Sequence, residues 1–86
     1  MRKFQRLSLN NARPTVLSIV IEPWATEVLL NPGSILDIMI SYKYDGYPYV
    51  VPHEDFVEVY LWSSCTFKLL IDNIEVVSPG LQAPHP

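Results

Sequence analysis

Three neighbouring residues, His53, Glu54 and Asp55, form the densest group of side chains in this sequence that could bind a cation. Imidazole nitrogens and carboxylate oxygens are ordinary metal ligands. Consecutive residues of one loop rarely converge on a single ion, however, and no second cluster in the sequence supplies the remaining ligands. We therefore predict a solvated polar loop at this position, and neither a metal site nor a cofactor.

Two further groups could support catalysis. Cys65 would be activated as a nucleophile if His53 lay beside it, because a nearby imidazole lowers the pKa of a thiol. Glu22 and Glu58 both stand near aromatic residues, as the two carboxylates of a glycoside hydrolase do. Nothing in the sequence fixes either pair at the required distance, and inert buried cysteines are common. The sequence therefore predicts a protein that is not an enzyme.

Aromatic side chains give the strongest signal of a binding surface. In the segment FVEVYLW, residues 56–62, aliphatic residues fill one face of a strand and mainly aromatic residues fill the other, so both faces require cover. We rank packing within the chain first, a homodimer face second and a platform for a stacked sugar ring third. The candidate interface or ligand-binding residues, including aromatic residues of other segments, are Trp24, Tyr42, Tyr49, Phe56, Tyr60 and Trp62.

The elements that would position these side chains are strands. Short β-branched segments alternate with turn residues, and no stretch shows a capped helical period. We predict an all-β fold of about seven short strands, either a small antiparallel sandwich or an open barrel such as a partial jelly roll. In residues 15–22, the period of two places Leu17, Ile19 and Ile21 on one face.

The central element is predicted to be a hairpin over residues 35–51. Its two strands are joined by Asp45-Gly46, since these residues accept the positive φ angles of a two-residue turn. That turn would pair Tyr42 with Tyr49. The apolar face of the first strand is predicted to contain Leu36, Ile38 and Ile40.

Two other turns are recognisable from their residue types. Asn31-Pro32-Gly33-Ser34 has the proline and glycine positions of a type II turn. Asp72-Asn73 is predicted to join a second hairpin, which pairs Ile71 with Ile74 and Leu69 with Val76.

Charge and composition set the domain boundaries. Of the 6 lysines and arginines in this 86-residue chain, Arg2, Lys3, Arg6 and Arg13 lie in the first 14 residues, whereas all 9 carboxylates lie later. We predict a flexible basic leader over residues 1–14, a single β-domain over 15–78 and a tail over 79–86. An acidic domain argues against nucleic-acid binding. No apolar run is long enough for a membrane helix, and the single cysteine is typical of a cytoplasmic protein.

Several short motifs also suggest a family. Glu22-Pro23-Trp24, Pro32-Gly33 and Val59-Tyr60-Leu61-Trp62 resemble the "EPW…PG…VYxW" pattern of small uncharacterised bacterial proteins, and more distantly the cupin-like β-barrels. The resemblance implies a cupin-like fold and no particular activity. Metal cupins carry histidines after such a glycine, and this chain has none between Gly33 and Pro52. The resemblance therefore implies a barrel without the metal site.

These observations leave two functions open. The first is a non-catalytic β-domain that acts through protein contacts, most simply as a homo-oligomer, because a chain of this length buries only about 60% of its unfolded surface. The second is a metal-free, cupin-like domain that binds a small molecule or carbohydrate.

Overall fold

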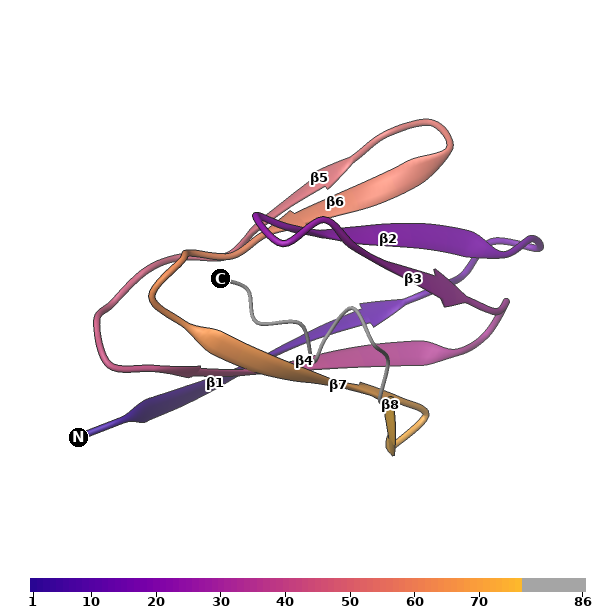
Figure 1. The fold of residues 1–86 in the computed structure, drawn as a ribbon. Coiled ribbons are helices and arrows are strands. Elements are labelled where there is room, and N and C mark those ends of the chain that lie inside the picture. The colour runs from indigo at the N-terminus through magenta and orange to yellow at the C-terminus, as the bar shows by residue number, and fades with distance from the viewer. Residues whose placement is uncertain (77–86) are drawn as a thin grey trace.

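The chain folds into a sandwich of two four-stranded β-sheets (Figure 1). The computed structural model describes residues 1–76. The strands are β1 (Lys3–Asn10), β2 (Leu17–Glu22), β3 (Thr26–Leu30), β4 (Ile35–Tyr42), β5 (Tyr49–Pro52), β6 (Phe56–Tyr60), β7 (Thr66–Ile71) and β8 (Ile74–Val76). The predicted all-β class is confirmed, and β1 is the strand that was not predicted. Residues 1–76 contain no helix of the length and apolarity that a membrane crossing requires.

The two sheets differ in strand direction. The first sheet has the order β1-β4-β7-β8, and all of its neighbouring strands are antiparallel. The second sheet has the order β3-β2-β6-β5, and its central pair, β2 and β6, is parallel. Among the strands of residues 1–76, hairpins within one sheet join only β2 to β3, β5 to β6 and β7 to β8. The other connections cross from one sheet to the other, so the chain closes both ends of the sandwich.

The core lies between the sheets and is built from alternate residues of the central strands. The predicted inward faces of β2 and β4 are confirmed, because alternation along a strand fixes the face whatever its partner is. Tyr49 and Val51, which were predicted to share the face of Leu36, are exposed instead. Within the described residues, the fully buried aliphatic side chains include Ile19 and Ile21 from β2, Leu36, Ile38 and Ile40 from β4, Val59 from β6 and Leu69 from β7.

The predicted hairpin over residues 35–51 is wrong. β4 pairs with β1 and β7, whereas β5 pairs with β6 in the other sheet. Tyr42 and Tyr49 are therefore not partners, and the connection between them crosses the sandwich. Gly46 does not have the positive φ that the predicted turn requires. Position 46 requires glycine for a different reason, since the Trp62 ring occupies the space that a Cβ at this position would fill.

The predicted flexible leader is also wrong. Residues 3–10 form an edge strand that pairs with β4 along its whole length. Leu7 and Leu9 lie opposite Ile38 and Leu36 and pack against the core. The domain therefore begins at β1 and not at residue 15. The predicted tail, residues 79–86, and the last two residues of the predicted domain lie outside the described part of the chain.

Both remaining turn predictions are confirmed. The Ser34 amide donates to the Asn31 carbonyl at 3.0 Å, and Gly33 has a φ of 81°, as a type II turn requires. This turn connects strands of different sheets. Asp72 and Asn73 have φ angles of 50° and 69°, and they join β7 to β8 in the predicted register.

Candidate interaction surfaces

The outer face of the second sheet combines exposed tyrosines with carboxylates. The register places Tyr49 beside Tyr60 and Tyr60 beside Glu22 in one row across the strands. The next row contains Val51, Glu58, Val20 and Glu27. Tyr49 is 64% exposed and Tyr60 is 38% exposed. We call the surface made by these two rows the tyrosine–glutamate face.

A hydrogen-bonded group orders the centre of this face. Nε2 of His53 lies 2.7 Å from Oε1 of Glu58, and the His53 ring stacks on Phe56 with a centroid distance of 4.3 Å. The hydrogen bond with His53, followed by one with Tyr60, lowers the pKa of Glu58. The same Glu58 carboxylate is the main cause of the raised pKa of Tyr60. Glu58 is therefore held as a carboxylate beside a neutral phenol.

Three of the six predicted site residues serve internal packing. Trp62 meets Tyr42 edge to face at a centroid distance of 5.3 Å, and its indole nitrogen donates to the Tyr44 carbonyl at 3.0 Å. Trp24 packs against Phe67 at 4.9 Å. Trp24, Tyr42 and Trp62 therefore pack against the core of their own chain.

The other three predicted residues, Tyr49, Phe56 and Tyr60, lie on the outer face of the second sheet. Phe56 is partly covered by His53. The structure therefore divides the predicted aromatic set, and it leaves Tyr49 and Tyr60 as the members that are open to solvent.

The candidate catalytic residues lie in different surroundings. Cys65 is 3% exposed within the core, and burial raises the pKa of its thiol, which is opposite to what a nucleophile needs. His53 is exposed and engages Glu58 instead. Glu22 and Glu58 do share the tyrosine–glutamate face: Glu22 lies opposite Tyr60 on β2, and Glu58 lies two residues before Tyr60 on β6. Among residues 1–76, no three histidine, cysteine or acidic side chains are grouped as metal ligands would be.

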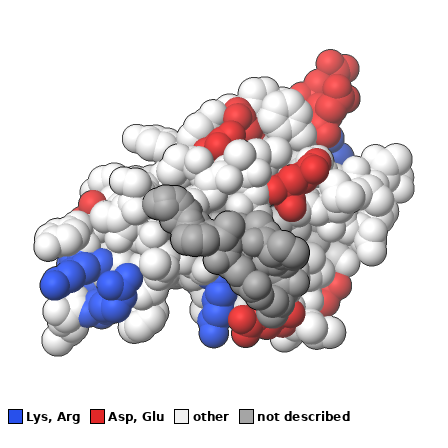
Figure 2. Space-filling model, in the orientation of Figure 1, with Lys and Arg blue, Asp and Glu red and all other residues white. Residues whose placement is uncertain are grey.

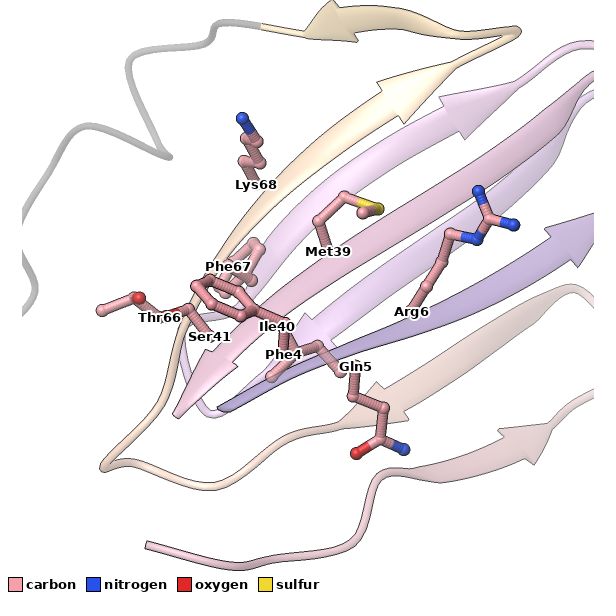
Figure 3. Close-up of a pocket in the computed structure, with 9 residues that line it drawn as sticks. All are labelled: Phe4, Gln5, Arg6, Met39, Ile40, Ser41, Thr66, Phe67 and Lys68. Carbon is pink, nitrogen blue, oxygen red and sulfur yellow. The ribbon is translucent and has the colours of Figure 1, made fainter. Parts of the chain in front are cut away.

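Basic side chains gather on one part of the outer face of the first sheet, while Asp37 and Glu75 lie in the row beyond them. Arg6, Met39 and Lys68 lie side by side on β1, β4 and β7, and Phe4, Ser41 and Thr66 form the neighbouring row. Figure 3 shows Arg6, Met39 and Lys68 rising from the same side of these strands, with Gln5 on the other side. Together with Arg2, these two rows make up what we call the basic face.

The basic face contains a groove of about 650 Å³. Its lining residues are Phe4, Gln5, Arg6, Met39, Ile40, Ser41, Thr66, Phe67 and Lys68. The Arg2 guanidinium donates to the hydroxyl and the carbonyl of Ser41, so a third cation is held beside the groove. The sequence identified the basic residues of β1 but treated them as part of a leader. Only strand pairing brings them next to Lys68.

The two signs of charge are unevenly spread over the surface. Figure 2 shows a group of lysine and arginine side chains at the end of the molecule that bears the N-terminus and several carboxylates on the second sheet at the top of the view, while further charges of both signs lie along the lower edge and at the upper right. No protein-family model matches this chain, and neither does any curated protein or solved structure. The two faces are therefore the features from which a function has to be argued.

Proposed function

We propose that this chain is a non-catalytic β-sandwich domain that acts through protein contacts, and that the tyrosine–glutamate face binds a second copy of the chain. The observation that supports this most directly is the adjacent pair Tyr49 and Tyr60, which are exposed on neighbouring strands. Tyrosine is enriched in protein interfaces, because its ring buries a large apolar area while its hydroxyl keeps a polar partner.

The strand that carries Tyr49 adds to this surface. All four residues of β5 are exposed, and β5 is an edge strand of the second sheet. On the far edge, Leu29 of β3 is 63% exposed. A small domain with such an apolar surface is stabilised when a partner covers it. A reducing compartment such as the cytoplasm fits this proposal, because Cys65 lies buried as a free thiol.

The experiment compares tyrosine variants by sedimentation velocity across a range of concentrations. We expect the parent chain to self-associate and the double variant Tyr49→Ser/Tyr60→Ser to have a reduced mass at the same concentration. The matched control is Tyr44→Ser/Tyr47→Ser, which removes two exposed tyrosines from the connection between β4 and β5. Trp62→Ser is a poor test, since Trp62 contributes to internal packing.

Circular dichroism must show that both double variants are folded. A parent chain that remains a monomer at every concentration would rule out self-association. An equal loss of mass in the control would show that the tyrosine–glutamate face is not the contact surface.

A second candidate function is small-molecule or carbohydrate binding by a domain without a metal, and the groove on the basic face is the observation that favours it. Trp24 packs against Phe67, which lines the groove, so a bound ligand should change tryptophan fluorescence. A panel of sugars and small organic anions that leaves the fluorescence unchanged would argue against this function.

A further inference from the structure

One row of the basic face has a charged, apolar, charged order. Arg6 lies opposite Met39, and Met39 lies opposite Lys68, on three adjacent strands. Since neighbouring strands are about 4.8 Å apart, the backbone positions of the two cations are about 10 Å apart, with Met39 between them. Both cationic side chains are exposed. Within residues 1–76, neither of them forms an ion pair.

The tyrosine–glutamate face has a row with the same geometry and the opposite charge. Glu58 lies beside Val20, and Val20 lies beside Glu27, again on three adjacent strands. The two carboxylates are therefore also about 10 Å apart on the backbone, with an apolar side chain between them. Glu27 is exposed, and the Glu58 side chain is 19% exposed beside His53.

The rows next to these two contain a groove on one face and exposed tyrosines on the other. Beside the basic row, Phe4 is 77% exposed at the mouth of the groove of about 650 Å³. Beside the acidic row, Tyr49 and Tyr60 project from the sheet. A groove that is lined by Phe4 and Met39 is suited to an aromatic ring, and Ser41 and Thr66 supply hydroxyl groups that can bind its phenol.

Charge decides how two copies could meet. Pairing a tyrosine–glutamate face with another such face would bring carboxylates together, and pairing two basic faces would bring cations together. Pairing unlike faces instead matches Arg6 and Lys68 with Glu27 and Glu58. The two faces lie on opposite sides of one sandwich. When two copies meet in this way, one copy therefore keeps a free basic face and the other keeps a free tyrosine–glutamate face.

We propose that the basic face of one copy receives the tyrosine–glutamate face of the next, so that copies of this chain associate head to tail through the Arg6–Met39–Lys68 and Glu58–Val20–Glu27 rows. This proposal rests on the proposed function and adds the identity of the opposing surface. It predicts association that continues beyond a dimer and weakens with salt, because exposed charges are screened over about 8 Å at physiological ionic strength.

The test uses single charge reversals with matched controls. Lys68→Glu alters the basic face, and Lys43→Glu makes the same change in the connection after β4. Glu27→Lys alters the tyrosine–glutamate face, and Glu54→Lys makes the same change in the loop before β6. All four positions are exposed, so each variant should fold. We expect Lys68→Glu and Glu27→Lys each to weaken association roughly tenfold at low salt, and the controls to have little effect.

Mixing the two face variants gives the most specific result. A 1:1 mixture of Lys68→Glu and Glu27→Lys should regain mass above that of either variant alone, because each then meets an intact opposite face. If Glu27→Lys weakens association while Lys68→Glu does not, the head-to-tail arrangement is wrong and the proposed function stands. If Lys68→Glu abolishes only the binding of a small organic anion, the groove is a ligand site and this proposal is wrong.

Discussion

The Trp62 ring lies directly against the backbone at Gly46. A Cβ built on Gly46 would stand 2.6 Å from both Cγ and Cε2 of Trp62, which is far inside van der Waals contact. Trp62 follows β6 of the second sheet, and Gly46 lies in the connection that crosses from the first sheet. Their contact, together with the indole hydrogen bond to Tyr44, fixes this crossing against the end of the core.

We expect Gly46→Ala to lower the free energy of unfolding by about 2 kcal/mol, because the added methyl group must displace an aromatic ring from a packed position. Urea denaturation followed by tryptophan fluorescence measures this change. In a Trp62→Ala background the same substitution should cost little, so a double-mutant cycle should show strong coupling.

Gly33→Ala is a useful comparison for this prediction. No heavy atom lies within 4 Å of a Cβ at Gly33, and only its φ of 81° opposes the substitution. We expect a cost of about 1 kcal/mol that is independent of Trp62. If Gly46→Ala costs the same with and without the Trp62 ring, contact with the ring is not what requires glycine there.

Gly46 also shows why part of the fold could not be predicted. The sequence predicts a positive-φ turn at Asp45-Gly46, but a tight turn and a close contact with a distant ring both require glycine. Local residue preference cannot distinguish these causes. The strand faces, by contrast, depend only on alternation, and therefore Leu36, Ile38 and Ile40 were assigned correctly although their partner strands were not.

The same argument applies to the candidate site. Exposure of Tyr49 and Tyr60 and burial of Trp24 depend on which strands become neighbours, and single-sequence patterns do not define this. The basic face was missed because Lys68 is separated from Arg6 by 62 positions and meets it only through β4. The alternation of Leu7 and Leu9 with polar residues was the local signal that could have identified β1 as a strand.

Asn11 ties the end of β1 to both sheets from a fully buried position. Its side-chain amide donates to the carbonyls of Thr15 and Leu30, and its side-chain oxygen accepts from the Arg13 amide. We expect Asn11→Ala to lower the free energy of unfolding by about 3 kcal/mol, because it removes the donor to the buried Leu30 carbonyl and to the partly buried Thr15 carbonyl. Thermal and urea unfolding measure the loss.

Asn10→Ala is the control for this prediction, since the neighbouring Asn10 is exposed, and it should change stability by less than about 0.5 kcal/mol. Asn11→Asp should be at least as harmful as Asn11→Ala, because a carboxylate would face two carbonyl oxygens. Similar stabilities of the Asn10→Ala and Asn11→Ala variants would contradict this account of the buried amide.

The hydrogen bonds to the Asp72 carboxylate predict that the protein loses stability in acid. Its carboxylate accepts hydrogen bonds from the Ile35 amide at 2.9 Å and the Ser34 hydroxyl at 2.8 Å, and these bonds, the first being the stronger cause, lower the pKa of Asp72. A lowered pKa in the folded state means that the stabilisation is complete above the unfolded value of about 3.9 and is lost as the pH falls through the folded value.

Asp72→Asn keeps a residue that tolerates the positive φ of this turn but removes the charge. We expect the variant to melt a few degrees below the parent at pH 7 and to converge with it at a pH low enough to protonate Asp72 in the folded state. Asp55→Asn, in an exposed loop, should follow the parent at both pH values. A constant difference between Asp72→Asn and the parent across this range would show that the charge of Asp72 is not responsible.

Two residues of β1 allow the contribution of this strand to the core to be measured separately from its contribution to the surface. Leu7 packs inward against the core, whereas Phe4 projects from the basic face and is 77% exposed. We expect Leu7→Ala to lower the free energy of unfolding by about 2 kcal/mol, because truncation of a partly buried leucine creates a cavity. Phe4→Ala should change stability by less than about 0.5 kcal/mol but should weaken self-association at low salt.

Urea denaturation and sedimentation velocity on the same samples check both effects. A flexible N-terminal segment would leave stability unchanged in both variants, and a strand with no role in association would leave the mass of Phe4→Ala equal to that of the parent.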